Sequence, residues 1–289
     1  MLIAALEVNA FGTEVNGIYY YFDNDNFTAE VTFGHGRYTG NISIPETVEN
    51  EDCTYTVTSI GKQAFYGCPE IFSVKIPSSV TSIGDFAFQY CGKLKEVNIP
   101  NGVRQIGTDA FDNCMALESV VLPGSIQTMG YNCFHSCTAL KKVTIMNGCQ
   151  MISPLAFGYC KNLSSVVIGK DVKEIGKWAF YSDDNIKEVY FYAVDLPTTD
   201  APFEEADMQG ATLYVPASAI EKYKNTEPWN GFGAIVPIGQ IPAGVLTTRY
   251  DTTHVDSYYS LDGKLLFGKP ERAGVYIKNG KKLIIKQHD

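Results

Sequence analysis

A unit of 23 residues recurs six times between residues 57 and 191, and this repeat constrains the fold more than any other feature of the chain. The first three units carry an Ile-Gly pair, then an Ala-Phe pair, then a Cys, at fixed spacing, and each later unit keeps most of these residues. The Phe recurs without exception, at Phe65, Phe88, Phe111, Phe134, Phe157 and Phe180. A fixed period of this length indicates a solenoid, because one unit cannot bury its own apolar face whereas stacked units can.

The residue types within one unit predict its course. Residues 97–99 alternate between inward and outward positions before Pro100, which predicts a short strand that ends there. Residues 103–107 predict a second extended stretch, with Gly107 allowing a tight turn. The spacing of three to four between apolar residues in 110–117 predicts one or two helical turns that lead to the next strand.

The Phe column predicts the core. We expect each ring to lie on the ring of the next unit, with about 1.5–3 kcal/mol of stabilisation per buried ring. Phe180 belongs to the last unit and is expected to end the stack. Its removal should therefore destabilise the fold less than removal of Phe111, since an irregular cap can relax around the cavity.

The pattern IGxxAFxxCxxLxxVxIP, as in residues 83–100, resembles the 23-residue BspA-like subclass of bacterial leucine-rich repeats. The likeness covers residues 57–191 and decays in the last copy, where Asp183 replaces Cys and Tyr192 replaces Pro. The resemblance implies a repeat solenoid, that is, a β-rich leucine-rich repeat with short helical or 3-10 turns, capped at both ends. It also implies a secreted or cell-surface bacterial protein that binds a host matrix protein, another surface protein or a glycan.

Segments on either side of the repeats predict caps, because the terminal coils of a solenoid must be covered. Residues 17–56 predict an N-terminal β cap, in which residues 23–26 form a polar hairpin turn, although they share some features with a calcium loop. Residues 192–240 predict a C-terminal cap with one strand, one short helix and an aromatic plug around Trp229.

Residues 241–289 predict a small all-β module of two hairpins, one with a DG turn and one with an NG turn. The segment resembles the C-terminal sorting domain of surface proteins from Bacteroidetes, and an ordinary small β module is the alternative. Residues 1–16 are interpreted as a possible signal-peptide remnant, because an apolar start runs into Val8-Asn9-Ala10. An ordinary N-terminal segment is the alternative, since the first basic residue is Arg37.

Composition and motifs exclude several classes of function. A net charge of −9 argues against nucleic acid as a partner, because phosphates are neutralised by Lys and Arg. No apolar run reaches the roughly 18 residues of a transmembrane helix. The four His are scattered, and no zinc, phosphate-loop or hydrolase motif is present. We therefore expect no cofactor, no metal and no catalytic activity.

Eight cysteines raise the question of disulfides, and their positions argue against them. Seven lie in apolar columns of the repeat and only Cys53 lies outside. A free Cys packs as a small hydrophobe. We therefore expect buried thiols, with at most Cys53 readily reactive.

The outward positions of the repeat strands vary in charge and size, while the inward positions are mostly Val or Ile. Repeat arrays commonly bind partners on such a face. The candidate partner-binding residues are Lys142, Thr144, Ser165, Val167, Glu188, Tyr190 and Tyr192. We expect their side chains to point to solvent, with the aromatic ones as anchors. The alternative is a structural or spacer module for surface display or sorting, without a ligand of its own.

Overall fold

The computed structural model describes residues 12–238 and the backbone of four short strands between residues 258 and 285. The chain divides into two compact units, residues 1–238 and 239–289. The possible signal remnant lies mostly outside the described residues, as do the DG turn at 262–263 and the NG turn at 279–280. Within the described ranges, no helix has the length and apolar character needed to cross a membrane.

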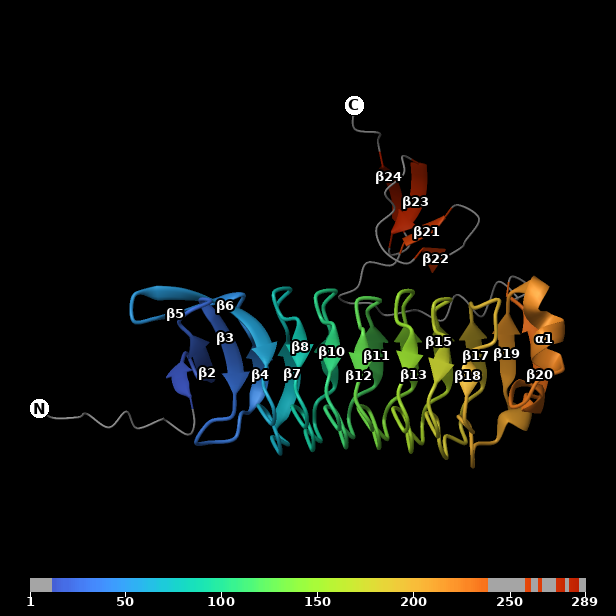
Figure 1. The fold of residues 1–289 in the computed structure, drawn as a ribbon, viewed down its shortest axis with the longest axis horizontal. Coiled ribbons are helices and arrows are strands. Elements are labelled where there is room, and N and C mark those ends of the chain that lie inside the picture. Colours follow the sequence, from blue (N-terminus) through green and yellow to red (C-terminus); the bar gives the residue numbers. More distant parts are fainter. Residues whose placement is uncertain (1–11, 239–257, 261–264, 267–273, 279–280, 286–289) are drawn as a thin grey trace, which may run out of the picture. The chain divides into compact units, whose positions relative to one another are not determined.

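The first unit is a solenoid whose coils each contribute one strand to each of two parallel rows (Figure 1). We call these the long-strand row and the short-strand row. The long-strand row contains β4 (Gly40–Ser43), β7 (Ile71–Lys75), β9 (Glu96–Asn98), β11 (Ser119–Leu122), β13 (Lys142–Ile145), β15 (Ser165–Ile168), β17 (Glu188–Phe191), β19 (Thr212–Val215) and β20 (Ala234–Pro237). The short-strand row contains β3 (Thr28–Thr32), β6 (Cys53–Ile60), β8 (Ser82–Ile83), β10 (Gln105–Ile106), β12 (Thr128–Met129), β14 (Met151–Ile152), β16 (Glu174–Ile175) and β18 (Thr198–Thr199).

Strand pairing follows the sequence period. Gln105 of β10 pairs with Ser82 on one side and Thr128 on the other, so its partners lie one repeat before and one repeat after it. Equivalent residues of successive coils therefore stand side by side in parallel register. This arrangement confirms the repeat solenoid predicted from the 23-residue period.

Both ends of the solenoid carry elements that the repeats lack. At the N-terminal end, β1 (Thr13–Val15), β2 (Ile18–Asp23) and β3 form an antiparallel meander, and β5 (Thr47–Asn50) pairs with β6. The Asp23 carboxylate accepts hydrogen bonds from the backbone of Asp25 and Asn26, as expected of a hairpin turn. At the C-terminal end lie η1 (Met208–Gly210), η2 (Ala217–Ala219), α1 (Ile220–Lys224) and η3 (Trp229–Gly231).

The Phe column forms a continuous stack. Adjacent rings between Phe65 and Phe180 are nearly parallel, with centroids 4.9 to 5.5 Å apart. The expectation that Phe180 ends the stack is wrong, because Phe203 of the cap lies on its far side at 5.5 Å. Trp229 and Phe232 then meet Phe203 edge-on. The core therefore extends past the last repeat into the C-terminal cap.

The turns between the rows differ from the prediction. Residues 110–117 form no helix, and the same holds in every repeat from 57 to 191. Instead, two β-turns per coil carry a residue with positive φ, as at Asp109 (53°) and Asn113 (59°). The amides of these turns bond to the next coil: Phe111 N–H donates to the Cys133 carbonyl at 2.8 Å. Bonds to the next coil replace the helical bonds, because stacking offers each amide a partner there.

Seven of the eight cysteines are buried and Cys53 is half-buried, all as free thiols. In the Cys column the thiols of Cys91, Cys114, Cys137 and Cys160 donate to the carbonyl of the Phe one coil earlier, as Cys114 Sγ does to Phe88 at 3.2 Å, whereas Cys68 donates to Tyr66 of its own coil. Burial raises the pKa of the Cys114 thiol well above its ordinary value. The prediction of buried thiols is confirmed.

Asp183 occupies the next position in the Cys column. Its side chain is fully buried, and neither carboxyl oxygen has a hydrogen-bond partner. Burial raises the pKa of this carboxyl from 3.8 to about 8. The folded chain therefore holds Asp183 as a neutral acid at neutral pH, which avoids leaving a charge in the core.

The second unit contains β21 (Tyr258–Ser260), β22 (Leu265–Leu266), β23 (Gly274–Lys278) and β24 (Lys281–Ile285). These strands form one antiparallel sheet in the order β22-β21-β23-β24. Tyr259 pairs with Leu265 and Val275 pairs with Ile284, so β21 is antiparallel to β22 and β23 is antiparallel to β24.

Candidate functional site

Six of the seven candidate binding residues lie side by side on the long-strand row. Lys142, Ser165 and Glu188 are partners in the register of β13, β15 and β17. Thr144, Val167 and Tyr190 form the parallel column two positions further along the same strands. We call these six residues the sheet-face patch. Tyr192 follows the end of β17, where its amide donates to the Ile168 carbonyl at 3.1 Å.

The expectation that the whole patch is open to solvent is wrong for two residues. Val167 is 4% exposed and Tyr190 is 7% exposed. The Tyr190 ring lies face to face with the ring of Tyr214 at a centroid distance of 4.4 Å, and its hydroxyl lies 3.2 Å from a Glu188 carboxylate oxygen. Large side chains in register on strands roughly 4.8 Å apart cover one another, and the sequence pattern does not display this effect.

Charge on the sheet-face patch is concentrated at Lys142 and Glu188. Burial lowers the pKa of Lys142 to about 8, and the Glu188 carboxylate opposes that shift. Lys142 therefore changes charge close to neutral pH, whereas an ordinary surface lysine remains charged there.

The sequence prediction missed Thr212 and Tyr214 of β19, which continue both columns of the patch. Glu188 pairs with Thr212 and Tyr190 pairs with Tyr214. The sequence does contain a signal for these residues, since the side chains of residues 211–216 alternate in character and the segment ends at a Pro, as a repeat strand does. The step from Glu188 to Thr212 is longer by one residue than the repeat period, so a search at fixed spacing does not align the predicted cap strand with the patch.

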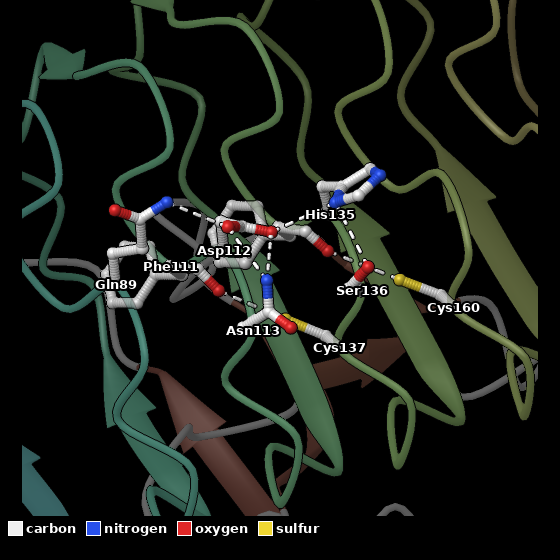
Figure 2. Close-up of polar contacts among 9 residues, drawn as sticks. Gln89, Phe111, Asp112, Asn113, His135, Ser136, Cys137 and Cys160 are labelled. Carbon is white, nitrogen blue, oxygen red and sulfur yellow. Dashed lines mark hydrogen bonds and ion pairs between the residues drawn. The ribbon is translucent and has the colours of Figure 1, made fainter. Parts of the chain in front are cut away.

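A second polar cluster lies on the turns that connect the rows (Figure 2). Asp112 accepts hydrogen bonds from Gln89 at 2.8 Å and from Asn113 at 2.9 Å, and His135 Nδ1 lies 2.9 Å from its carboxylate. Burial raises the pKa of Asp112, but the hydrogen bonds from these neighbours outweigh burial and keep the pKa below its ordinary value. Asp112 is therefore a fixed carboxylate that orients the His135 ring. Sequence reasoning had treated His135 as one of several scattered histidines.

No group of three or more His, Cys, Asp or Glu side chains is arranged to hold a metal ion among the residues that the structure describes.

Comparison with known proteins identifies the repeats. Residues 58–187 match the family model described as BspA type Leucine rich repeat region, in six copies. Among solved structures, a leucine-rich repeat protein from T. pallidum is 31% identical over 62% of this chain and 81% of that chain, with a TM-score of 0.56. None of the curated proteins matches the sequence.

Two further structures are similar at lower TM-scores. A leucine-rich repeat protein from Bacteroides capillosus is 29% identical over 46% of this chain and 96% of that chain, with a TM-score of 0.40. A leucine rich cell surface protein from Faecalibacterium prausnitzii is 18% identical over 79% of this chain and 95% of that chain, with a TM-score of 0.31.

Proposed function

The chain belongs to the leucine-rich repeat proteins with BspA type repeats, and from that premise we propose that it is a non-enzymatic binding protein, secreted or displayed on a bacterial cell surface. The partner is a protein or glycan, held on the long-strand row at the sheet-face patch. The observation that carries this proposal is the register of β13, β15 and β17, which gathers a lysine, a glutamate and a tyrosine into one patch.

The size of the surface limits the mode of binding. Nine strands at about 4.8 Å spacing, each showing about four residues at 3.3 Å, give a face of some 560 Å². A stable protein interface takes about 800 Å² from each partner. The contact therefore either extends beyond the face, towards Tyr192, or is weak and gains strength from many copies on one surface.

The test measures binding of the full chain to immobilised host matrix proteins and surface glycans. The variant Lys142→Ser/Glu188→Ser should lower affinity at least tenfold, because both residues lie in the patch and Ser already occupies the position between them at Ser165. The matched control is Lys75→Ser/Glu96→Ser, which removes one exposed charge of each sign from β7 and β9 of the same row.

Unchanged binding in the patch variant, with binding lost in the control variant, would place the site at the N-terminal end of the row. Binding of neither class of partner by the parent chain would favour a spacer or sorting module. That second function is supported by the separate unit of residues 239–289, which resembles a sorting domain in sequence. Removal of that unit should then abolish surface attachment and leave the solenoid folded.

A further inference from the structure

The turns that join the two rows carry a continuous line of aromatic and polar side chains. The ring centroids of Tyr66 and Tyr90 are 5.8 Å apart. Further along, Asp112 contacts His135, whose ring centroid lies 5.3 Å from that of Tyr159. The Tyr159 ring in turn lies 5.2 Å from the Tyr181 ring. Gln89, next to Tyr90, bonds to Asp112 and closes the gap between the two halves. We call Tyr66, Tyr90, Asp112, His135, Tyr159 and Tyr181 the turn strip. Each of its members comes from a different coil.

Three tyrosines of the turn strip are exposed, although the core does not require them. Tyr66 is 45% exposed, Tyr90 is 47% exposed and Tyr159 is 39% exposed. They lie on the outer side of the turns, and the Phe stack fills the inside without them. Exposed aromatic rings arranged in a row on a surface are typical of an interaction site.

Backbone strain supports the same conclusion. Tyr90 and Tyr159 have φ of 63° and 60°, in the left-handed region that disfavours bulky residues by about 1–2 kcal/mol. Other coils place Gly67, Asn113 or Ser136 at this position, so the backbone does not require a large side chain there. Strained exposed tyrosines that add little to the core indicate a role in binding.

The fixed polar groups of the turn strip suit hydroxyl groups. With Nδ1 of His135 directed at the Asp112 carboxylate, that nitrogen carries a proton, and in the neutral ring Nε2 is then an acceptor. Figure 2 shows the second ring nitrogen directed away from the cluster. The imidazole is 24% exposed, so a hydroxyl group from solvent can donate to it. Lys161 lies 5.4 Å from the Tyr159 ring, and its ammonium already bonds to Ser182.

The dimensions exclude a broad partner. Six coils spaced by about 4.8 Å give the turn strip a length of about 24 Å, and two residues across give a width of roughly 7 Å. The resulting area is far below the 800 Å² or so that each protein contributes to a stable interface. A peptide cannot add as a further strand either, because the backbone amides here already bond between coils, as Tyr90 N–H does to the Asp112 carbonyl at 3.0 Å.

We propose that the turn strip is a second binding site, separate from the sheet face, for an extended uncharged glycan. The C–H faces of its sugar rings pack on Tyr66, Tyr90 and Tyr159, where the electron-rich ring faces attract their partial positive charge. Its hydroxyl groups bond to His135. The carboxylates here are Asp112 and Glu205, which bonds to Tyr181, and the neighbouring Lys161 is already engaged, so the strip gives no basis for selecting a charged glycan.

The test is affinity electrophoresis of the full chain in gels that contain soluble uncharged polysaccharides, namely hydroxyethylcellulose, galactomannan and starch. At least one should retard the parent chain. The variant Tyr90→Asn/Tyr159→Asn should lower the affinity at least tenfold, with little change in melting temperature, because Asn113 occupies this backbone position in another coil. The control Phe72→Lys removes an equally exposed ring elsewhere and should leave retardation unchanged, since Lys95 is its counterpart in the next coil.

Several outcomes would overturn the proposal. Retardation that survives in the tyrosine variant, or no retardation in any of the three gels, rejects the site or the ligand class. Binding to heparin alone would indicate a charged glycan, and binding to polyproline peptides alone would indicate a protein ligand. If the variant does not fold, nitration of Tyr90 and Tyr159 in the parent chain provides the alternative measurement, with protection expected when the polysaccharide is bound. The Lys142→Ser/Glu188→Ser variant should be retarded like the parent, which separates this site from the sheet face.

Discussion

The middle of the solenoid and its C-terminal end are built from the same columns, but the columns end differently. In the middle, Phe111 lies between two parallel rings at 4.9 Å, and the thiol of Cys114 donates to a carbonyl. At the end, the aromatic column continues to Phe203, whereas the Cys column gives way to the unpartnered Asp183. An aromatic column needs only apolar area, so the cap can extend it. The thiol column needs a small donor at each step, and the last repeat lacks one.

The largest expected effect concerns the aromatic column. Phe111→Ala should lower the free energy of unfolding by about 3–5 kcal/mol, because coils on both sides prevent the cavity from collapsing. Phe180→Ala should lose as much, since Phe203 covers its far side. Phe203→Ala should lose less, about 2–3 kcal/mol, since the ring is at the margin of the core, 7% exposed. Urea unfolding measures all three, and a clearly smaller loss for Phe180 than for Phe111 would show that the cap does not continue the stack.

Asp183 gives a smaller effect with a characteristic pH dependence. Its pKa is about 8 in the folded chain, so between pH 4 and 8 the folded state holds a proton that the unfolded state has released. The free energy of unfolding should therefore fall as pH rises through this range, by at most about 1.4 kcal/mol per pH unit, and level off above it. Lys161, Asp184 and the buried Cys160 are the ionisable groups that face it.

Asp183→Cys should remove this slope and restore the thiol column, with a gain of about 1–3 kcal/mol at pH 8. Thermal unfolding at several pH values measures both effects. The control Asp184→Ser changes the exposed neighbouring carboxylate and should retain the slope. A slope that persists in Asp183→Cys would assign the pH dependence to another group.

The smallest expected effect concerns the turns. Gln63 is exposed and has φ of 59°, so Gln63→Gly relieves a left-handed residue at little cost in packing. Relief of the left-handed strain is worth about 1–2 kcal/mol, and the conformational entropy that Gly loses on folding offsets part of it. The net gain in the free energy of unfolding is about 0.5–1 kcal/mol. Gly107→Ala should have the opposite sign, since an added Cβ would lie 2.4 Å from the Asp85 amide nitrogen. A loss of stability for Gln63→Gly would show that the turn tolerates side chains without strain.

The sequence predicts the parts of this fold that repeat. The Phe column and the buried thiols follow from residue types at a fixed period, and the strand predicted at residues 97–99 is found as β9, Glu96–Asn98. The conformation of the turns does not follow from the pattern. Apolar residues spaced by three to four fit a helix as well as they fit two β-turns that bond to the next coil. Phe203 lies one period after Phe180, but its neighbours Pro202 and Glu204 make its place in the Phe column hard to recognise from the sequence.

The candidate site was predictable only in part. Alternation along β13, β15 and β17 placed six residues on one face, and the register bears out their proximity. The exposure of Tyr190 depends on Tyr214, which belongs to a strand displaced from the repeat period. The contact between Asp112 and His135 joins two coils, and it becomes visible only when the outward residues of the turns are aligned by period.

The hydrogen bonds from each coil to the next have a mechanical consequence. They run along the axis of the stack, so a pull on the two ends loads one coil interface after another. Each coil of 23 residues that detaches converts a rise of about 5 Å into a contour of about 80 Å. Neighbouring coils can remain folded, because each contacts only its own neighbours. Under tension the solenoid should therefore lengthen in equal steps, which would limit the force that reaches whatever is bound at its other end.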